Sequence, residues 1–170
     1  MAAAIPVVRV ISPGRNVGKT WLAERLIAWF TGRGYEVLAV KRSHHPIVSD
    51  RPGTDSDRFA RAGAAVVVFG GSDGTLARAP HAEHLEEITT RFAGTADLAI
   101  VEGFTGDALG AQLEIFPGPP VVVHLTATNG RSLLTAPLDD IETIAVGVAR
   151  ALELTAPAGT ILRPPTSRGV

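Results

Sequence analysis

The chain contains no cysteine, which excludes disulfide bonds, thiol catalysis and any zinc site built from cysteine. Its formal net charge is -1, so it has no excess of positive charge to attract nucleic acid. No apolar run approaches the length of a membrane span, and the first residues lack the charged flank and apolar core of a secretory signal. We therefore expect a cytoplasmic protein with neither a nucleic-acid nor a membrane partner.

Lysine is scarce in a chain whose basic residues are otherwise arginine. Only Lys19 and Lys41 are lysines, against 14 arginines. A lysine ammonium is a compact charge suited to phosphate. Lys41 ends the apolar segment 35–41, which makes it a candidate phosphate ligand. An ordinary lysine at the end of a strand is the alternative.

Residues 7–26 contain the most informative pattern in the chain. An apolar run rich in β-branched residues leads into a glycine-containing loop, then Gly18-Lys19-Thr20, then apolar residues at helical spacing. This order predicts a strand, a phosphate-binding loop and a helix. Lys19 would reach the β and γ phosphates of a nucleoside triphosphate, and the Thr20 hydroxyl would ligate its Mg²⁺. An ordinary glycine turn is the alternative.

The loop departs from the usual pattern at its beginning. Pro13 occupies the position of the first glycine of such loops, and proline has a fixed φ and no N–H. We expect Gly14, its neighbour, to supply the flexibility instead.

The rest of the chain alternates strand and helix patterns. The expected helices are 19–33, 54–63, 81–92 and one opened by a capping box at 139–142. The expected strands are 35–41, 64–69, 75–78, 97–104, 112–116 and 121–125. The strands 35–41 and 64–69 are expected to be buried, and a tight turn at 70–74 precedes 75–78. Strand, helix, strand order implies parallel pairs. We predict an α/β chain with a P-loop NTPase-like three-layer fold, its sheet mainly parallel with some antiparallel strands. A nucleotide-binding domain would span residues 1–154, followed by a Pro/Gly-rich tail, 155–170.

Further polar residues are expected at the edge of the sheet where the phosphate loop lies. Glu102 ends an apolar strand, as does the carboxylate of the second nucleotide motif, which contacts Mg²⁺ directly or through water. It could also simply mark where the strand meets solvent. His44 and His45 lie in a polar loop, where a phosphate or substrate role is favoured over a transition metal because adjacent residues point in opposite directions. Solvated loop histidines are the alternative.

Several ordered blocks together resemble one known family. They are Asn16-Val-Gly-Lys-Thr20, Val40-Lys-Arg-Ser-His-His45, Pro52-Gly-Thr-Asp-Ser56, Arg58-Phe59, Ala62-Gly-Ala64, Asp97-Leu-Ala-Ile-Val-Glu-Gly-Phe104 and Pro137-Leu-Asp-Asp-Ile-Glu142. The chain thereby resembles the MobB proteins of molybdopterin guanine dinucleotide biosynthesis. The resemblance implies a GTP-binding accessory protein with weak Mg²⁺-dependent hydrolysis, which assists the MobA nucleotidyltransferase. Molybdopterin is a further expected partner, and a homodimer with a sheet extended between subunits is implied.

The resemblance also assigns roles to individual residues. The triphosphate would be held by Gly14, Arg15, Asn16, Val17, Gly18, Lys19 and Thr20. Lys41, His44 and His45 would line the site, while Asp55 and Glu102 would face the metal or the attacking water. Arg15 and Arg42 are candidates for a charge-stabilising arginine.

Two other functions fit the same motifs. A small-molecule kinase would use the phosphate loop together with a pocket for an acceptor hydroxyl. A nucleotide-binding interaction module would need no useful catalysis. The Asn-Lys-x-Asp signature by which many GTPases read guanine is absent, so the residues alone leave the choice between guanine and adenine open.

Overall fold

The computed structural model describes residues 4–43, 52–79 and 84–157. The chain divides into two compact units, one formed by residues 1–42 and 85–170 and the other by residues 43–84. The larger unit contains the phosphate loop, and the smaller one interrupts it in sequence. The extent of a nucleotide-binding domain over residues 1–154 stays a prediction. Among the described residues, no helix has the length and hydropathy needed to cross a membrane.

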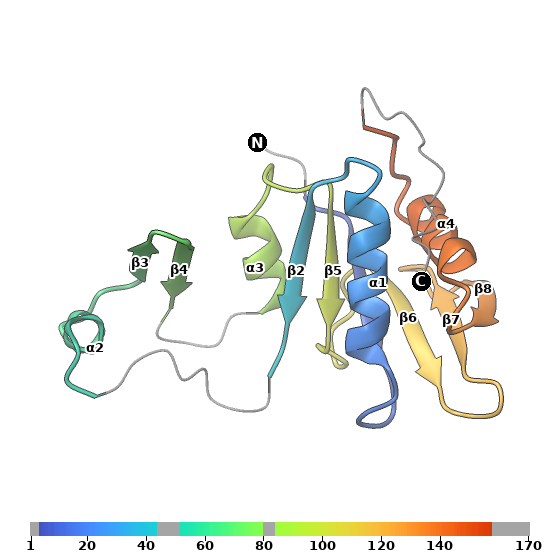
Figure 1. Cartoon of the computed structure of the whole chain (residues 1–170), viewed down its shortest axis with the longest axis horizontal. Helices are drawn as coiled ribbons and strands as arrows, with labels where there is room; N and C mark the ends of the chain where they lie inside the picture. Colours follow the sequence, from blue (N-terminus) through green and yellow to red (C-terminus); the bar gives the residue numbers. More distant parts are fainter. Residues whose placement is uncertain (1–3, 44–51, 80–83, 158–170) are drawn as a thin grey trace, which may run out of the picture. The chain divides into compact units, whose positions relative to one another are not determined.

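The larger unit is built on a six-stranded sheet with the order β2-β5-β1-β6-β7-β8. Its strands are β1 (Val7–Ile11), β2 (Val37–Lys41), β5 (Leu98–Glu102), β6 (Ala111–Phe116), β7 (Val122–Thr126) and β8 (Ser132–Pro137). β2, β5, β1 and β6 are mutually parallel, whereas β7 and β8 add antiparallel pairs. The parallel strands all point toward one edge of the sheet, where β1 continues into the phosphate loop (Figure 1).

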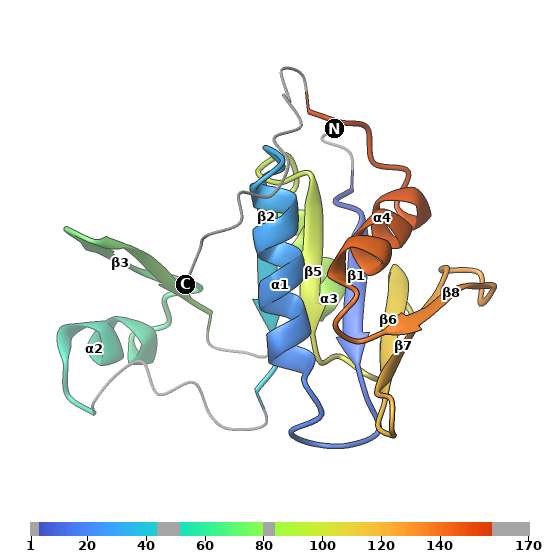
Figure 2. The same ribbon diagram turned by 45° about the vertical axis from the view of Figure 1, so that its right-hand side comes forward.

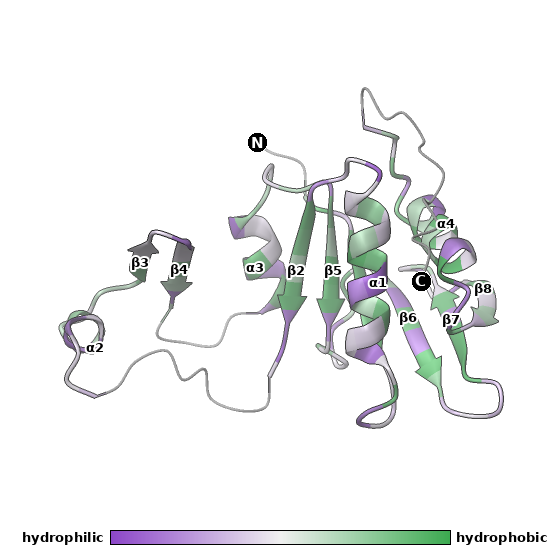
Figure 3. Cartoon of the chain, viewed as in Figure 1, coloured by the Kyte–Doolittle hydropathy of each residue, from purple (hydrophilic) through white to green (hydrophobic). Residues whose placement is uncertain are grey.

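Helices cover both faces of this sheet. α1 (Lys19–Thr31) and α4 (Ile141–Ala151) pack on one face and α3 (Leu85–Arg91) on the other, as Figure 2 shows. β1 is buried on both sides, with Val8 and Val10 facing Leu22 and Leu26 of α1. The hydropathy colouring of Figure 3 shows β2 and β5 as mostly hydrophobic. The predicted three-layer α/β fold is confirmed.

The smaller unit consists of α2 (Asp55–Arg61) and a hairpin of β3 (Val67–Gly71) and β4 (Gly74–Arg78). Thr54 caps α2 as predicted, because its side chain accepts a hydrogen bond from the Asp57 N–H. The strand predicted at 64–69 is found three residues later, as β3, but the expectation that it is buried is wrong: Val67 is 7% exposed, whereas Val68 is 62% exposed. A two-stranded hairpin has too few strands to bury both of its faces.

Three details of the larger unit differ from the predictions. β2 is an edge strand and is only partly buried, because it has a neighbour on one side alone. β8 is not predicted at all. The capping box predicted at 139–142 is not formed: the N-cap of α4 is Asp140, which accepts from the Thr143 N–H at 3.1 Å, and Glu142 accepts from the Trp29 indole at 2.6 Å.

Gly110 lies where the β5–β6 connection passes close to β1. It has a φ of 78°, and a Cβ there would lie 2.6 Å from the Val7 Cβ and overlap the Val7 carbonyl oxygen. We expect Gly110→Ala to lower the free energy of unfolding by about 3 kcal/mol or more, from backbone strain and overlap together. Gly130 has a φ of 82° with nothing within 4 Å, so Gly130→Ala should cost only about 1–2 kcal/mol. Equal losses in urea unfolding would contradict the close approach.

Candidate functional site

The phosphate loop joins the end of β1 to the start of α1 and needs two residues in the left-handed backbone region. These are Asn16, with a φ of 56°, and Gly18, with a φ of 99°. Gly14, which was expected to supply flexibility beside Pro13, is not one of the residues with a positive φ. Asn16 takes the role, because asparagine tolerates left-handed geometry better than other side chains.

The N-terminus of α1 is open to an anion. Gly18 is its N-cap and provides no side-chain hydrogen bond, and the first turn of this described helix has no acidic residue. The first backbone N–H groups and the positive end of the helix dipole are therefore not neutralised by the chain itself. This is the arrangement in which phosphate binds at helix N-termini.

Lys19 folds back over the loop. Its ammonium donates to the Ser12 hydroxyl at 2.8 Å and to the Gly14 carbonyl at 2.6 Å. The Ser12 hydroxyl in turn donates to the Gly14 carbonyl at 2.7 Å. The ammonium is thus held above the loop by oxygen acceptors, the kind of acceptor that a phosphate also supplies. The sequence analysis did not single out Ser12, although a polar residue directly after a buried strand is a usable signal.

A second cluster lies beside the loop and joins three elements. The Thr20 hydroxyl donates to Glu102 Oε2 at 2.8 Å, and the Lys41 ammonium lies 3.3 Å from that oxygen and 3.4 Å from the Thr20 hydroxyl. Lys41 and Glu102 are register partners at the ends of β2 and β5. The structure therefore brings together three residues that are far apart in sequence and were predicted for one site.

The donor set of this cluster fits a Mg²⁺ ion carried by a nucleotide. A threonine hydroxyl and a carboxylate oxygen are hard oxygen ligands, and Mg²⁺ in phosphate sites commonly takes few protein ligands besides the phosphates. The Glu102 side chain is 15% exposed, so the carboxylate is shielded but reachable. Within the described part of the chain, no group of three His, Asp or Glu side chains could hold a metal without the nucleotide.

Asp55 belongs to the smaller unit. It lies in the first turn of α2 with one carboxylate oxygen 3.5 Å from the Arg58 guanidinium. Asp57 is the better-held carboxylate there, because it accepts from the Gly53 N–H at 2.8 Å and pairs with Arg61 at 2.9 Å. The Gly53 hydrogen bond, followed by Arg61, lowers the pKa of Asp57. A catalytic role for Asp55 stays a prediction.

The remaining predicted residues are placed as follows. His44 and His45 lie outside the described residues. Arg15 is exposed on the loop. The Arg42 guanidinium lies 4.9 Å from the centre of the Phe104 ring, and the Arg42 N–H donates to the Glu102 carbonyl at 3.0 Å. Their roles toward a nucleotide stay predictions.

Arg9 is a buried charge that the sequence analysis passed over. It is 4% exposed in the middle of β1 and donates to the carbonyls of Leu109, at 2.9 Å, and Phe104, at 3.2 Å. Burial lowers the pKa of its guanidinium, and Asp107 opposes the shift. Both carbonyls belong to the segment that follows Glu102, so Arg9 holds the backbone behind the site. A charged residue inside an apolar run was the available signal.

A pocket of about 670 Å³ lies between α4 and the tip of the β7–β8 hairpin, lined by residues that include Asn129, Arg131 and Arg150. β7 runs antiparallel to β6, so its carboxyl end lies at the edge opposite the phosphate loop. This pocket therefore takes no part in the site.

Arg9→Met removes the guanidinium and keeps an unbranched side chain. We expect it to lower the free energy of unfolding by about 2–4 kcal/mol, because one buried and one partly buried carbonyl lose their donor. Urea unfolding followed by circular dichroism measures the loss. Arg131→Met changes an exposed arginine next to β8 and should cost less than about 0.5 kcal/mol. A loss for Arg9→Met no larger than for Arg131→Met would show that Arg9 does not hold the loop.

The chain is similar to known proteins of one family. Residues 7–129 match the family described as molybdopterin guanine dinucleotide synthesis protein B, MobB. The chain is 30% identical over 135 residues to a molybdopterin-guanine dinucleotide biosynthesis adapter protein of Haemophilus influenzae, covering 78% of this chain and 67% of that protein. It is 31% identical over 107 residues to the Escherichia coli protein of the same name, covering 59% of this chain and 60% of that protein.

A crystal structure described as molybdopterin-guanine biosynthesis protein B has a similar fold. Its TM-score is 0.58 at 20% identity, covering 87% of this chain and 99% of that chain. At that identity the likeness concerns the fold alone. The family match extends over more than half of the sequence, from β1 through the end of β7, and includes the phosphate loop, Lys41 and Glu102. The chain belongs to the MobB family.

Proposed function

We propose that this protein is a GTP-binding accessory protein of molybdenum cofactor biosynthesis that hydrolyses GTP slowly with Mg²⁺. The observation that carries the proposal is the Thr20, Lys41 and Glu102 cluster, held within hydrogen-bond distance beside the phosphate loop. An ordinary glycine turn has no need for a lysine, a threonine and a glutamate arriving from three elements. Family membership supports the biosynthetic role.

Triphosphate binding would use groups that are already in place. The backbone N–H groups at the start of α1 would donate to the phosphate oxygens. Lys19 would exchange its contacts with Ser12 and Gly14 for the β and γ phosphates, since its ammonium already lies over the loop. Lys41 would add a second positive charge at the same edge of the sheet.

The Mg²⁺ ion would be held by Thr20 directly and by Glu102 directly or through water. When bound, the ion would neutralise charge that develops on the phosphates. The chain's own contribution is to fix the threonine hydroxyl by the 2.8 Å hydrogen bond to Glu102. Asp55, in the smaller unit, is proposed as a further acidic residue with a catalytic role.

Slow turnover is consistent with the surroundings of Glu102. One of its oxygens already accepts from Thr20 and pairs with Lys41. Because that oxygen is already engaged by two donors, it is poorly placed to orient and deprotonate an attacking water. Its arrangement suits holding a metal better than activating a nucleophile.

A partner enzyme is part of the proposal. The curated relatives are named adapter proteins, and the chain spans about two thirds and three fifths of their lengths. We propose that this protein likewise acts beside a MobA-type guanylyltransferase, and that it works as a homodimer. Co-purification with that enzyme, with and without GTP, is the direct test of the partner.

Lys19→Ala should weaken GTP binding about 100-fold in a calorimetric titration with Mg²⁺, because it removes a charged donor to the phosphates. Arg131→Ala deletes one positive charge at the opposite edge of the sheet and should leave the affinity unchanged. Unchanged affinity in Lys19→Ala would refute the phosphate loop. Tighter binding of ATP than of GTP would favour the kinase alternative.

Thr20→Val removes a hydroxyl while keeping the shape of the side chain. We expect the gain in GTP affinity on adding Mg²⁺ to fall about tenfold or more, because a metal ligand is lost. Thr20→Ser restores the hydroxyl and should retain the gain. If adding Mg²⁺ raises the GTP affinity of the unmodified protein, Thr20→Val and Thr20→Ser equally, Thr20 is not a ligand of the ion.

A further inference from the structure

A second pocket borders the phosphate loop on the side away from Glu102. It has a volume of about 360 Å³ and is lined by Trp21, Pro120, Val121, Leu138 and Asp139. In the sheet, β5 and β6 flank β1 on opposite sides. Glu102 ends β5, whereas the pocket is formed where β7 begins and where the chain passes from β8 to α4. These segments lie at the same edge as the loop because β7 runs antiparallel to β6.

The pocket is continuous with the phosphate loop. A Cβ on Gly18 would lie only 3.2 Å from a methyl carbon of Leu138, so the loop and the pocket wall pack together. The Leu138 N–H donates to the Val121 carbonyl at 3.0 Å, which joins the two segments of the wall. Trp21 directly follows Thr20 in the first turn of α1. The pocket therefore adjoins the loop on which the triphosphate is proposed to bind.

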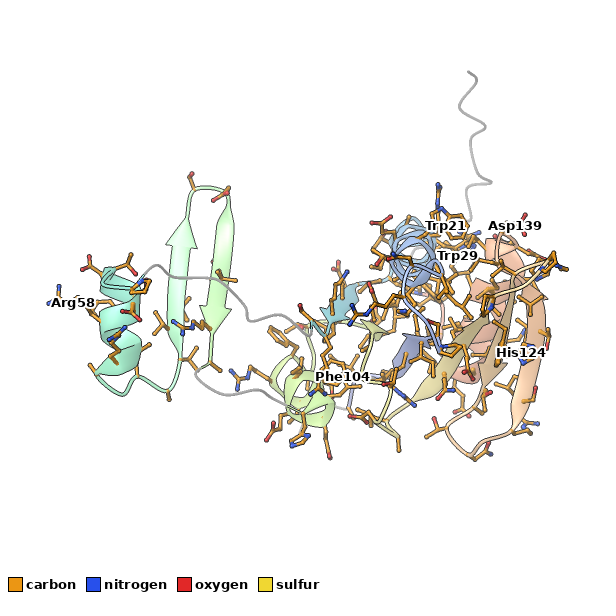
Figure 4. All side chains as sticks on the ribbon, turned by 90° about the horizontal axis from the view of Figure 1, so that it is seen from below. Trp21, Trp29, Arg58, Phe104, His124 and Asp139 are labelled. Carbon is orange, nitrogen blue, oxygen red and sulfur yellow. The ribbon has the colours of Figure 1, made fainter. Side chains whose placement is uncertain are left out.

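Trp21 offers an aromatic surface. Its large apolar side chain is 38% exposed, whereas Leu22 and Leu26 of the same helix are fully buried. The Arg25 guanidinium lies 5.4 Å from the centre of its ring. Figure 4 views the molecule from the edge with the phosphate loop and shows Trp21 and Asp139 beside α1. An exposed aromatic ring beside a phosphate site suits stacking with a nucleobase.

Asp139 offers two hydrogen-bond acceptors. The next two acidic residues are engaged: Asp140 caps α4, and Glu142 binds Trp29 and Arg33. Among the residues that the structure describes, no donor contacts the Asp139 carboxylate. Guanine carries a ring N–H and an exocyclic amino group side by side, which match two carboxylate oxygens. Adenine places an acceptor nitrogen in the corresponding position, which a carboxylate would repel.

We infer that this pocket is the base-binding part of the nucleotide site, in which Trp21 stacks against the base and Asp139 selects guanine. The inference rests on the proposed triphosphate site. It supplies the guanine specificity that the sequence motifs left open. The volume of the pocket, about 360 Å³, lies within the range of small-ligand pockets, roughly 300–1,000 Å³.

The specificity test compares GTP with xanthosine triphosphate, whose base has a carbonyl oxygen in place of the exocyclic amino group. We expect Asp139→Asn to weaken GTP binding about tenfold or more and to strengthen xanthosine triphosphate binding, because an amide can donate to that carbonyl. Asp140→Asn is the matched control. Asparagine also caps helices well, so the ratio of the two affinities should not change.

Two failures are distinguishable in this experiment. If Asp139→Asn leaves the ratio unchanged while both nucleotides still bind through Lys19, the base pocket is wrong and the phosphate loop stands. If the unmodified protein shows no Lys19-dependent triphosphate binding, the proposed function is wrong and this inference falls with it.

Stacking is tested by fluorescence, because the chain has two tryptophans. Trp29 lies near the other end of α1 with its indole bound to Glu142, so Trp29→Phe leaves Trp21 as the only tryptophan. We expect GTP to quench this emission and inorganic triphosphate, which has no base, to leave it unchanged. Trp21→Phe, which retains Trp29, should show no quenching by GTP. Equal quenching by GTP and inorganic triphosphate would refute the stacking.

Discussion

The parallel pairing of β1 with β5 on one side and β6 on the other is the constraint on which the site depends. It brings the carboxyl ends of the strands to one edge, so that the loop after β1 lies next to Glu102 at the end of β5. The same pairing of β5 with β2 places Lys41 opposite Glu102. Backbone hydrogen bonds, which do not depend on the identity of the side chains, thus position the side chains of the site.

Buried polar contacts fix what the backbone pairing leaves free. Arg9 holds the carbonyls of Phe104 and Leu109, in a segment whose backbone is already strained because Phe104 has a φ of 53°. A guanidinium can satisfy several acceptors at once, which suits it to a turn where backbone groups lack regular partners. The chain therefore places a charge inside its central strand and uses it to order the connection behind Glu102.

The sequence predicted the strand, loop and helix around Lys19 because each part has a strong local signal. It also predicted that Glu102 and Lys41 lie at the edge with the phosphate loop, since that follows from parallel order alone. β8 was not predicted, because its residues do not alternate regularly between buried and exposed. β2 was predicted to be buried, because composition does not reveal which strand lies at the edge of the sheet. Asn16 was recognised as part of the loop, but its left-handed conformation depends on how the whole loop closes.

The pocket beside Trp21 shows another limit of local reasoning. Its walls come from residues 21, 120–121 and 138–139, and no short motif contains them. Asp139 looks like part of a helix cap in the sequence, and only the structure shows that Asp140 alone does the capping. Asp139, which helix capping would explain in the sequence, is thus available to bind a ligand.

The start of α1 also has a thermodynamic consequence. Its N-cap is a glycine without a side-chain hydrogen bond, and its first turn lacks an acidic residue, so the helix is left without its own stabilising anion. A bound phosphate would take the place of the missing cap, and a ligand that binds only the folded chain stabilises it in proportion to the logarithm of its concentration. The persistence of this protein in a cell would then follow the size of its nucleotide pool.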